Sequence, residues 1–244
     1  MKEARKAEIL NLLKERRFLT VKTIGETLFV SLPTVRRDLT ALAQEGVIIR
    51  CHGGAVLPDE NHVALPYAYR MEKNKKEKQK MCRAAASLVR DGDVIFIDES
   101  SSAAWIPRFL EERKSLTVVT NAMPLSEMLS GLKDCTVYYT GGKLSESGAA
   151  LTGEYVEDFI GGILFDKVFF SVFGVREDGT LVETADWKRR LIKLLRKRGK
   201  TMVCLADREK FGVDAPYTSL FSGQLDVLIT DEDERNHAFR PGKW

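Results

Sequence analysis

The sequence contains no apolar run long enough to cross a lipid bilayer. Its longest apolar stretches, such as Val168 to Val175, are far shorter than the roughly 20 residues that a spanning helix needs. It also does not open with a basic segment followed by an apolar stretch, which is the pattern of a secretory signal. We therefore expect a protein that is neither secreted nor embedded in a membrane.

Cysteine clusters are also lacking. The four cysteines, Cys51, Cys82, Cys135 and Cys204, are scattered without a CxxC pair, and only Cys51 has a histidine beside it. This pattern argues against both a disulfide framework and a zinc site. We expect a cytoplasmic protein that carries neither a metal nor another cofactor.

The 244 residues are 44% hydrophobic, which is enough to build two domains with ordinary cores. Charged residues are distributed unevenly along the chain. Residues 1–56 hold ten Lys and Arg against six Asp and Glu, a net charge of +4, and the remaining residues hold 28 against 29, a net charge of −1. A basic module at one end favours a nucleic-acid partner, although a solvated helical surface carries a similar excess.

Three helices are predicted in the first module. Apolar residues at i, i+3 and i+4 within residues 2–16 indicate an amphipathic helix. Thr20 is expected to cap a second helix that runs to Leu28. Ser31 is expected to cap a third helix that continues to residue 44 or 45 and ends at Gly46.

The third helix has one apolar face, formed by Val35, Leu39 and Leu42, and an opposite polar face. In a helix-turn-helix the polar face enters the major groove, where Arg bonds guanine or phosphate and Thr contacts thymine or phosphate. Residues 47–49 are predicted to form a strand, residues 50–54 a tight turn and residues 55–56 a return strand. A hairpin in this position is a wing. A small protein-interaction module remains the alternative at this point.

The sequence from Val30 to Leu42, with Ser31, Thr34 and Arg36-Arg37-Asp38-Leu39, is followed by Glu45-Gly46 and then by Arg50-Cys51-His52-Gly53-Gly54-Ala55. This pattern resembles the DeoR family of bacterial sugar-metabolism regulators. The resemblance implies a winged helix-turn-helix over residues 1–57 that binds duplex operator DNA. We expect the DNA contacts to come from the recognition helix and the wing, at Ser31, Thr34, Arg36, Arg37, Thr40, Arg50, His52, Gly53 and Gly54.

Residues 58–75 have little periodicity and are expected to link two domains. The basic run from Lys73 to Lys80 permits two interpretations, a phosphate-binding stripe or a solvated helix face, of which we favour the solvated face.

Residues 76–244 alternate short apolar runs with helical patterns, which indicates a Rossmann-like α/β domain with a mainly parallel sheet. Helices are expected over 103–110 and 124–132. Strands are expected at 94–97, 117–120, 136–140, 167–173, 201–206 and 227–230.

Ligands of such sheets bind at the carboxyl ends of the strands, where this sequence is rich in small and polar residues. The segment from Ser100 to Ser102 is expected to hold an anion at the start of a helix, with Lys210 supplying a charge for phosphate. The expected effector-binding residues are Asp98, Ser100, Ser101, Ser102, Thr120, Asn121, Gly141, Gly142, Asp207 and Lys210.

These strand ends again resemble the DeoR family, in its C-terminal sensor domain, which is similar to ribose-5-phosphate isomerase. The resemblance implies a phosphorylated sugar as the effector. Three residues depart from the family pattern. Ser100 stands where glycine is usual, Ser102 where threonine is usual, and Glu209 where serine is usual.

Three hypotheses follow. The first is a ligand-controlled repressor that acts as a dimer or tetramer. The second is an aldose-ketose isomerase tethered to a DNA-binding module, against which the sequence offers no evident pair of carboxylate and lysine to serve as base and acid. The third is a partner-binding protein with a degenerate module, which predicts no sequence-specific DNA retention.

Overall fold

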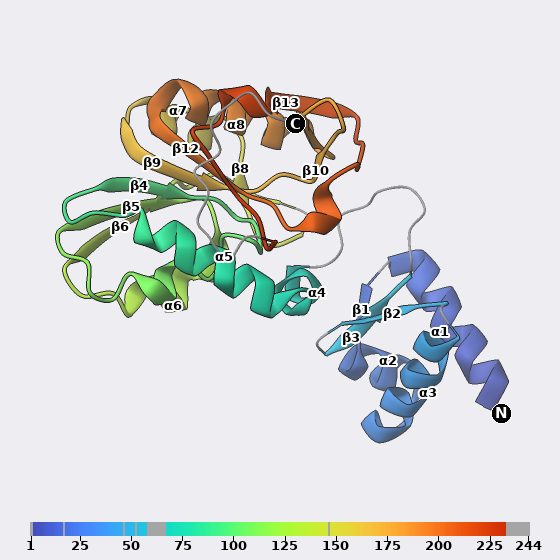
Figure 1. Ribbon diagram of the computed structural model, residues 1–244. Helices are drawn as coiled ribbons and strands as arrows, with labels where there is room; N and C mark the ends of the chain where they lie inside the picture. The colour runs from blue at the N-terminus through green and yellow to red at the C-terminus, as the bar shows by residue number, and fades with distance from the viewer. Residues whose placement is uncertain are drawn as a thin grey trace. The chain divides into compact units, whose positions relative to one another are not determined.

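The computed structural model describes residues 2–16, 18–45, 47–51, 53–57, 67–145 and 147–232. The chain divides into two compact units, Met1–Lys73 and Asn74–Trp244 (Figure 1). Each unit is described by itself below.

The first unit is a winged helix-turn-helix, as predicted. Its helices are α1 (Lys2–Arg16), α2 (Val21–Leu28) and α3 (Leu32–Gln44). Its strands are β1 (Phe18–Thr20), β2 (Ile49–Cys51) and β3 (Gly54–Val56), in an antiparallel sheet of order β1-β3-β2. Strand β1 was not predicted, and the first strand of the wing begins two residues later than predicted.

Capping and burial explain these helices. Thr20 accepts a hydrogen bond from the Thr23 amide at 2.9 Å, so it caps α2 as expected. Ser31 is the N-cap of α3, but its hydroxyl meets that of Thr34 at 2.9 Å and caps no backbone amide. The predicted apolar face of α3 is buried against Ile9 and Leu13 of α1 in one small core. Gly46, the expected terminator, lies outside the described residues.

The expected linker, residues 58–75, contains a helix that the sequence analysis missed. This helix, α4, spans Tyr67–Glu72. Residues 58–66 of the expected linker lie outside the described residues. The basic run leads into α5 (Lys75–Ser87), which belongs to the second unit.

The second unit is built on a six-stranded sheet of order β14-β12-β9-β4-β5-β6 in which all neighbours are parallel. All six predicted strands are confirmed, with shifts of at most three residues at their ends and none in the strand predicted at 94–97. They are β4 (Val94–Ile97), β5 (Leu116–Thr120), β6 (Cys135–Tyr139), β9 (Phe165–Phe170), β12 (Gly199–Leu205) and β14 (Val227–Ile229).

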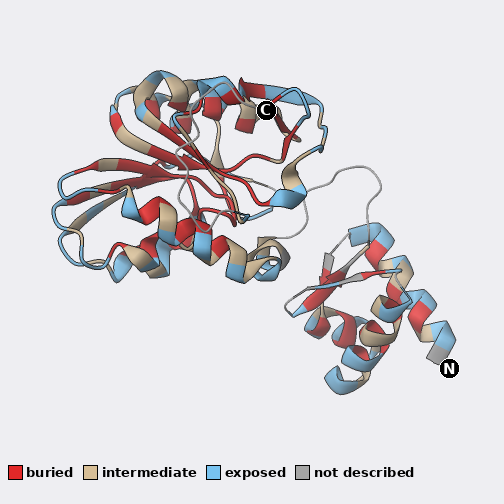
Figure 2. Ribbon diagram, viewed as in Figure 1, coloured by how far each residue is buried: buried red, intermediate tan, exposed pale blue. Residues whose placement is uncertain are grey.

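Helices cover both faces of this sheet, with α5 and α6 (Ser126–Ser130) on one side and α7 (Glu154–Gly161) and α8 (Asp186–Arg198) on the other (Figure 1). Because both faces are covered, the central strands β4, β5, β9 and β12 are buried over most of their length and fully so in the last two or three residues before their carboxyl ends (Figure 2). The largest fully buried side chains of these strands are Phe96, Phe165, Phe169 and Phe170. The rings of Phe96 and Phe165 pack edge to face with their centroids 5.7 Å apart.

Helices α7 and α8 and several short elements were not predicted. A second, antiparallel sheet of order β10-β11-β13 is formed by Gly174–Val175, Thr180–Glu183 and Tyr217–Phe221. A hairpin joins β7 (Lys143–Leu144) to β8 (Leu151–Thr152). The single-turn 3-10 helices are η1 (Ile106–Phe109), η2 (Met123–Leu125), η3 (Arg208–Lys210) and η4 (Ser222–Gln224). None of the helices in the described part of the chain is both long and apolar enough to span a membrane.

Candidate functional site

The polar face of α3 is open to solvent. Ser31, Arg36 and Arg37 are exposed, and Thr34 is half-buried beside Ser31. Because Val35, Leu39 and Leu42 hold the opposite face in the core, the two guanidinium groups are held at the surface of a fixed helix. The expected recognition residues therefore form one continuous, positively charged surface.

A buried carboxylate fixes the position of this surface. Asp38, next to the two arginines, is only 1% exposed and accepts two hydrogen bonds from the Arg5 guanidinium of α1, at 2.5 and 3.1 Å. The bond to Asp38 raises the pKa of Arg5. A bidentate pair of this kind sets both the distance and the angle between α1 and α3.

The wing meets the recognition helix through Arg50. Its guanidinium donates to the Thr40 hydroxyl at 2.9 Å, and that hydroxyl donates to the Arg36 carbonyl at 2.8 Å. Gly53 is exposed with φ of 80°, which favours glycine, whereas Gly54 is buried in the middle strand. His52 lies outside the described residues.

Polar residues follow four neighbouring strands of the large sheet. Asp207, Ser171, Asp98 and Asn121 stand just past β12, β9, β4 and β5, which are adjacent in that order. All four are buried. The carboxyl ends of these strands therefore bring together three residues that the sequence predicted and one, Ser171, that it did not.

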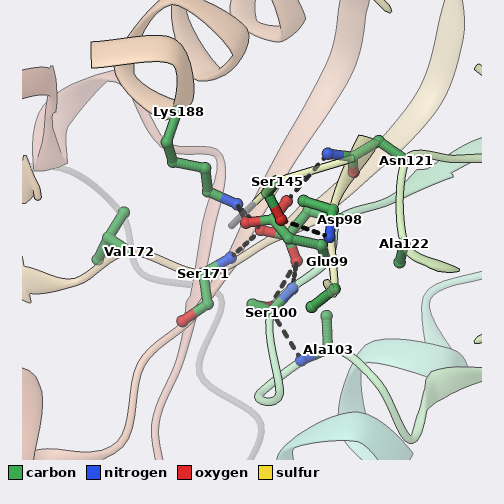
Figure 3. Close-up of polar contacts among 12 residues, drawn as sticks. Asp98, Glu99, Ser100, Ala103, Asn121, Ala122, Ser145, Ser171, Val172 and Lys188 are labelled. Carbon is green, nitrogen blue, oxygen red and sulfur yellow. Dashed lines mark hydrogen bonds and ion pairs between the residues drawn. The ribbon is translucent and has the colours of Figure 1, made fainter. Parts of the chain in front are cut away.

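A buried lysine joins these strand ends to α8 (Figure 3). The Lys188 ammonium donates to one carboxylate oxygen of Asp98 and one of Glu99, each at 2.6 Å. The second Glu99 oxygen accepts from the Asn121 amide at 3.2 Å, and Asp98 also accepts from the Ser171 backbone amide at 3.0 Å. These five residues form one hydrogen-bonded network, which we call the Lys188 network.

Electrostatics in the network favour a charged lysine. Burial lowers the pKa of Lys188, but the negative charges of Asp98 and Glu99 outweigh this effect and raise the pKa above its ordinary value. Glu183, at the end of β11, is also buried near this lysine. Burial raises the pKa of Glu183 to about 8, and the charge of Lys188 offsets only part of that rise.

Three buried polar atoms of this region have no hydrogen-bond partner among the residues that the structure describes. They are Asn121 Oδ1, Ser171 Oγ and Glu183 Oε1. Buried polar groups are nearly always satisfied, so each such atom requires an explanation, and a bound polar molecule is one. Two of the three belong to the Lys188 network itself.

The serine segment differs from the expectation. Turns follow Ser102 and only a 3-10 helix begins at Ile106, so the prediction of a helix over 103–110 is wrong, and the anion site expected at Ser100 to Ser102 lacks the helix start that was assumed for it. Asp98 accepts from the amide and the hydroxyl of Ser100, at 3.0 and 2.5 Å. The Ser100 hydroxyl in turn accepts from the Ala103 amide at 3.2 Å. Ser100 therefore shapes the loop from within.

The solvated-face interpretation of the basic run fails at one position. Lys78 is 4% exposed and donates to the Ser101 hydroxyl at 3.1 Å, while Cys82, one turn later, donates to the Ser102 carbonyl at 3.0 Å. The loop of Ser100, Ser101 and Ser102, which we call the serine loop, is therefore held by α5 from one side and, through Asp98, by Lys188 from the other.

The remaining predicted effector residues have different surroundings. Lys210 donates to the Val172 carbonyl at 2.6 Å, just past β9. Thr120 is fully buried, and its hydroxyl donates to the Ile97 carbonyl, so it joins β5 to β4. Gly141 and Gly142 follow the edge strand β6, and among the described residues no hydrogen bond joins them to the Lys188 network. A Cβ at Gly142 would lie 2.7 Å from the Thr152 carbonyl oxygen, so this glycine permits close backbone packing.

Sequence reasoning missed Lys78, Glu99, Ser171, Glu183 and Lys188. Two of them carried a detectable signal. Lys188 occupies the first position of an i, i+3, i+4, i+7 stripe completed by buried Leu191, Ile192 and Leu195. Lys78 begins an equivalent stripe on α5 with Met81, Cys82 and Ala85. A lysine in line with an apolar face is a sign of a buried ion pair.

Comparison with known families settles the identity of the two units. Residues 5–61 match the DeoR-like helix-turn-helix domain, and residues 73–232 match the DeoR C-terminal sensor domain. The chain belongs to the DeoR family. The predicted fold class, a winged helix-turn-helix followed by an α/β sensor domain, is therefore confirmed, as is the expectation of a DNA-binding transcription regulator instead of an enzyme.

This DeoR-family chain is 34% identical to the HTH-type transcriptional repressor GlcR of Bacillus subtilis, over 94% of this chain and 88% of that protein. It is 28% identical to the glycerol-3-phosphate regulon repressor of Escherichia coli, over 91% and 88%. Among solved structures it is similar to ribose 5-phosphate isomerase A of Methanocaldococcus jannaschii, with a TM-score of 0.41 and 18% identity over 57% of this chain and 55% of that one.

Replacing Lys188 tests the network. Lys188→Met removes the cation from two buried carboxylates, and breaking a buried ion pair in this way costs about 3–5 kcal/mol. We expect urea denaturation at neutral pH to show a loss of this size in the free energy of unfolding. Lys193→Met, on the exposed side of the same helix, should stay within about 0.5 kcal/mol of the unchanged chain. Equal stabilities of the two variants would contradict the network.

The raised pKa of Glu183 predicts that the stability of the fold depends on pH. Because its pKa rises from an ordinary 4.5 to about 8 on folding, the folded chain retains a proton that the unfolded chain releases between these pH values. The contribution of Glu183 to the free energy of unfolding is fully present below pH 4.5 and is lost as the pH rises through about 8. Glu183→Gln should flatten the fall of unfolding free energy with pH in this window by up to about 1.4 kcal/mol per pH unit.

The control for this measurement is Glu177→Gln, which changes an exposed acid in the turn before the same strand. Its pH profile should match that of the unchanged chain. A Glu183→Gln profile that is parallel to the control between pH 5 and 8 would show that Glu183 ionises normally.

Proposed function

We propose that this DeoR-family regulator represses a carbohydrate-catabolism operon in the bacterial cytoplasm and responds to a phosphorylated sugar that binds at the strand ends beside the Lys188 network. The observation that carries the effector part is the set of three unpartnered buried polar atoms at that place. The relatives named above are repressors, and one of them is the repressor of a glycerol-3-phosphate regulon, which supports the same class of effector.

The DNA contacts of this proposal come from the exposed face of α3 and from the wing. Arg36 and Arg37 supply guanidinium groups for guanine or phosphate, and Ser31 and Thr34 supply hydroxyls at the helix start. Arg50 and Thr40 are bonded to one another, so the wing and the recognition helix approach the duplex as one surface. His52, Gly53 and Gly54 complete the proposed contact set.

The effector contacts divide by chemistry. Asn121 Oδ1 and Ser171 Oγ form no hydrogen bond within the described residues, so both can bond the hydroxyl groups of a sugar, which donate and accept hydrogen bonds. The phosphate is assigned to Lys210, whose ammonium group lies at the Val172 carbonyl just past β9, and to the hydroxyls of Ser101 and Ser102. Asp98, Ser100, Thr120, Gly141, Gly142 and Asp207 complete the proposed set, with Ser100 and Thr120 shaping the site from within.

Regulation requires communication between the two parts. We assign residues 1–57 to the DNA-binding domain, 58–75 to the connection and 76–244 to the sensor domain. A homodimer or tetramer of such chains spans repeated half-sites, and an effector with different affinities for two arrangements shifts their populations.

Arg37 provides the test of the DNA contacts. If Arg37 reads a base, Arg37→Ala should weaken binding to DNA from the chain's own promoter region by roughly 1–3 kcal/mol and narrow the difference from random duplexes. Fluorescence anisotropy at fixed salt measures both affinities. Lys193→Ala serves as the control because it removes an exposed charge from the sensor domain. Unchanged affinity of the Arg37 variant would remove this residue from the contact set.

Lys210 provides the test of the effector site. A thermal-shift screen against sugar phosphates should find a compound that raises the melting temperature of the unchanged chain. Lys210→Ala should lose this response and retain its affinity for promoter DNA. Arg208→Ala is the matched control, because its side chain is 68% exposed on the same turn. A Lys210 variant that still responds normally would place the phosphate elsewhere.

A further inference from the structure

A surface hollow of about 340 Å³ lies between α5 and η1, away from the strand ends described above. Four cations line it, together with Gln79 and Phe109, and none of its lining residues in the described segments is a carboxylate. The cations are Lys76, Lys80, Arg83 and Arg108. We call this feature the α5–η1 groove.

The cations of the groove are not neutralised within the described part of the chain, where none of the four forms an ion pair. The basic helix α8 is different. Arg190 pairs with Glu157 and Asp186, Arg196 pairs with Asp226, and Lys200, just after the helix, pairs with Asp166. Those cations are neutralised by their partners, although Lys193 and Lys197 of the same helix form no ion pair within the described residues. In the groove all four cations lack an ion pair in the described segments, and this concentration of positive charge favours an anionic partner.

Aromatic rings hold both guanidinium groups of the groove in place. The Arg83 guanidinium carbon lies 4.7 Å from the centre of the Phe109 ring, and that of Arg108 lies 5.5 Å from the centre of the Trp105 ring. Cation–π contacts of this kind leave the N–H groups available to an anion. The arginines are therefore ordered before a ligand arrives, which reduces the entropy lost on binding.

The spacing of the cations along α5 indicates the shape of the partner. Lys76, Lys80 and Arg83 stand at i, i+4 and i+7, so they form one stripe about 10 Å long at 1.5 Å per residue. One strand of duplex DNA carries a phosphate about every 3.4 Å along its axis. The stripe is therefore about as long as three intervals between successive phosphates, measured along the duplex axis.

We propose that the α5–η1 groove binds the phosphodiester backbone of duplex DNA, as a second contact beyond the recognition helix and wing. The partner is one that this regulator already binds, and the 19 peptide steps from Leu57 to Lys76, which include helix α4, span less than the roughly 65 Å of a fully extended chain. DNA held by the winged unit thus raises the local concentration of phosphates around the groove. The contact is independent of base sequence, because the groove offers charges to the backbone alone.

The test uses the full chain and a random-sequence duplex several helical turns long, so that only backbone contacts are measured. Lys76→Gln/Lys80→Gln is compared with Lys193→Gln/Lys197→Gln. Both double variants remove two exposed lysines at i, i+4 from a 13-residue helix, and in the control pair neither lysine forms an ion pair within the described residues. Melting curves verify that both variants fold.

Binding is measured between about 50 and 200 mM salt, and the logarithm of the association constant is plotted against that of the salt concentration. Each lost phosphate contact reduces the slope by about 0.9, so the groove variant should show a slope smaller by about 1.8 while the control keeps the original slope. Equal slopes for the groove variant and the unchanged chain, or equal reductions in both variants, would overturn the proposal.

A second arm distinguishes DNA from a small anion. Inorganic phosphate at millimolar concentration is added to the unchanged chain and to the groove variant in a thermal-shift assay. Stabilisation that disappears in the groove variant, combined with an unchanged DNA slope, would show a small-anion pocket and refute the DNA contact. A reduced slope without any phosphate-specific stabilisation supports the DNA contact.

Discussion

The ion pairs of Lys188 with Asp98 and Glu99 are the constraint on which the sensor domain depends. Removing a lysine and two carboxylates from water is expensive, and the cost is recovered only when each group has close, well-directed partners. The two 2.6 Å contacts meet that condition. Through Asn121 and Ser171 the same network reaches β5 and β9. A helix on one face of the sheet and three strand ends are therefore held in a single arrangement.

The winged unit uses a buried carboxylate in a comparable way. Asp38 lies on the side of α3 that faces α1, because it is three residues from Val35 and four from Leu42, whereas Arg36 and Arg37 point outward. Helical periodicity thus places the two arginines of the Arg-Arg-Asp-Leu motif on the exposed face of α3 and the aspartate and leucine on its buried face. The arginines are available to a ligand, and the acid anchors the helix that presents them. A change at Asp38 would affect DNA binding without any contact between this residue and DNA.

Much of the fold was predictable, because long amphipathic helices and buried parallel strands leave clear periodic signals. The six strands of the large sheet and the three helices of the winged unit were found from such signals. The pairs β7–β8 and β10–β11 include strands of only two residues, which are too short for a period to appear. The segment after Ser102 looked helical, yet bonds within the Asp98–Ala103 loop produced turns. Lys188 and Glu183 were missed because their partners lie far away in sequence, although the position of Lys188 in an apolar stripe was a visible signal.

Helix α5 places two of these features on opposite sides of one rigid element. Lys78 and Cys82 face inward and bond the serine loop of the proposed effector site, while Lys76, Lys80 and Arg83 face outward in the α5–η1 groove. A ligand that moves or orders the serine loop acts on α5 through two hydrogen bonds. If the groove contacts DNA, the same displacement changes the position of its charges against the phosphates. By thermodynamic reciprocity, DNA bound at the groove would then alter the affinity of the effector site by the same factor.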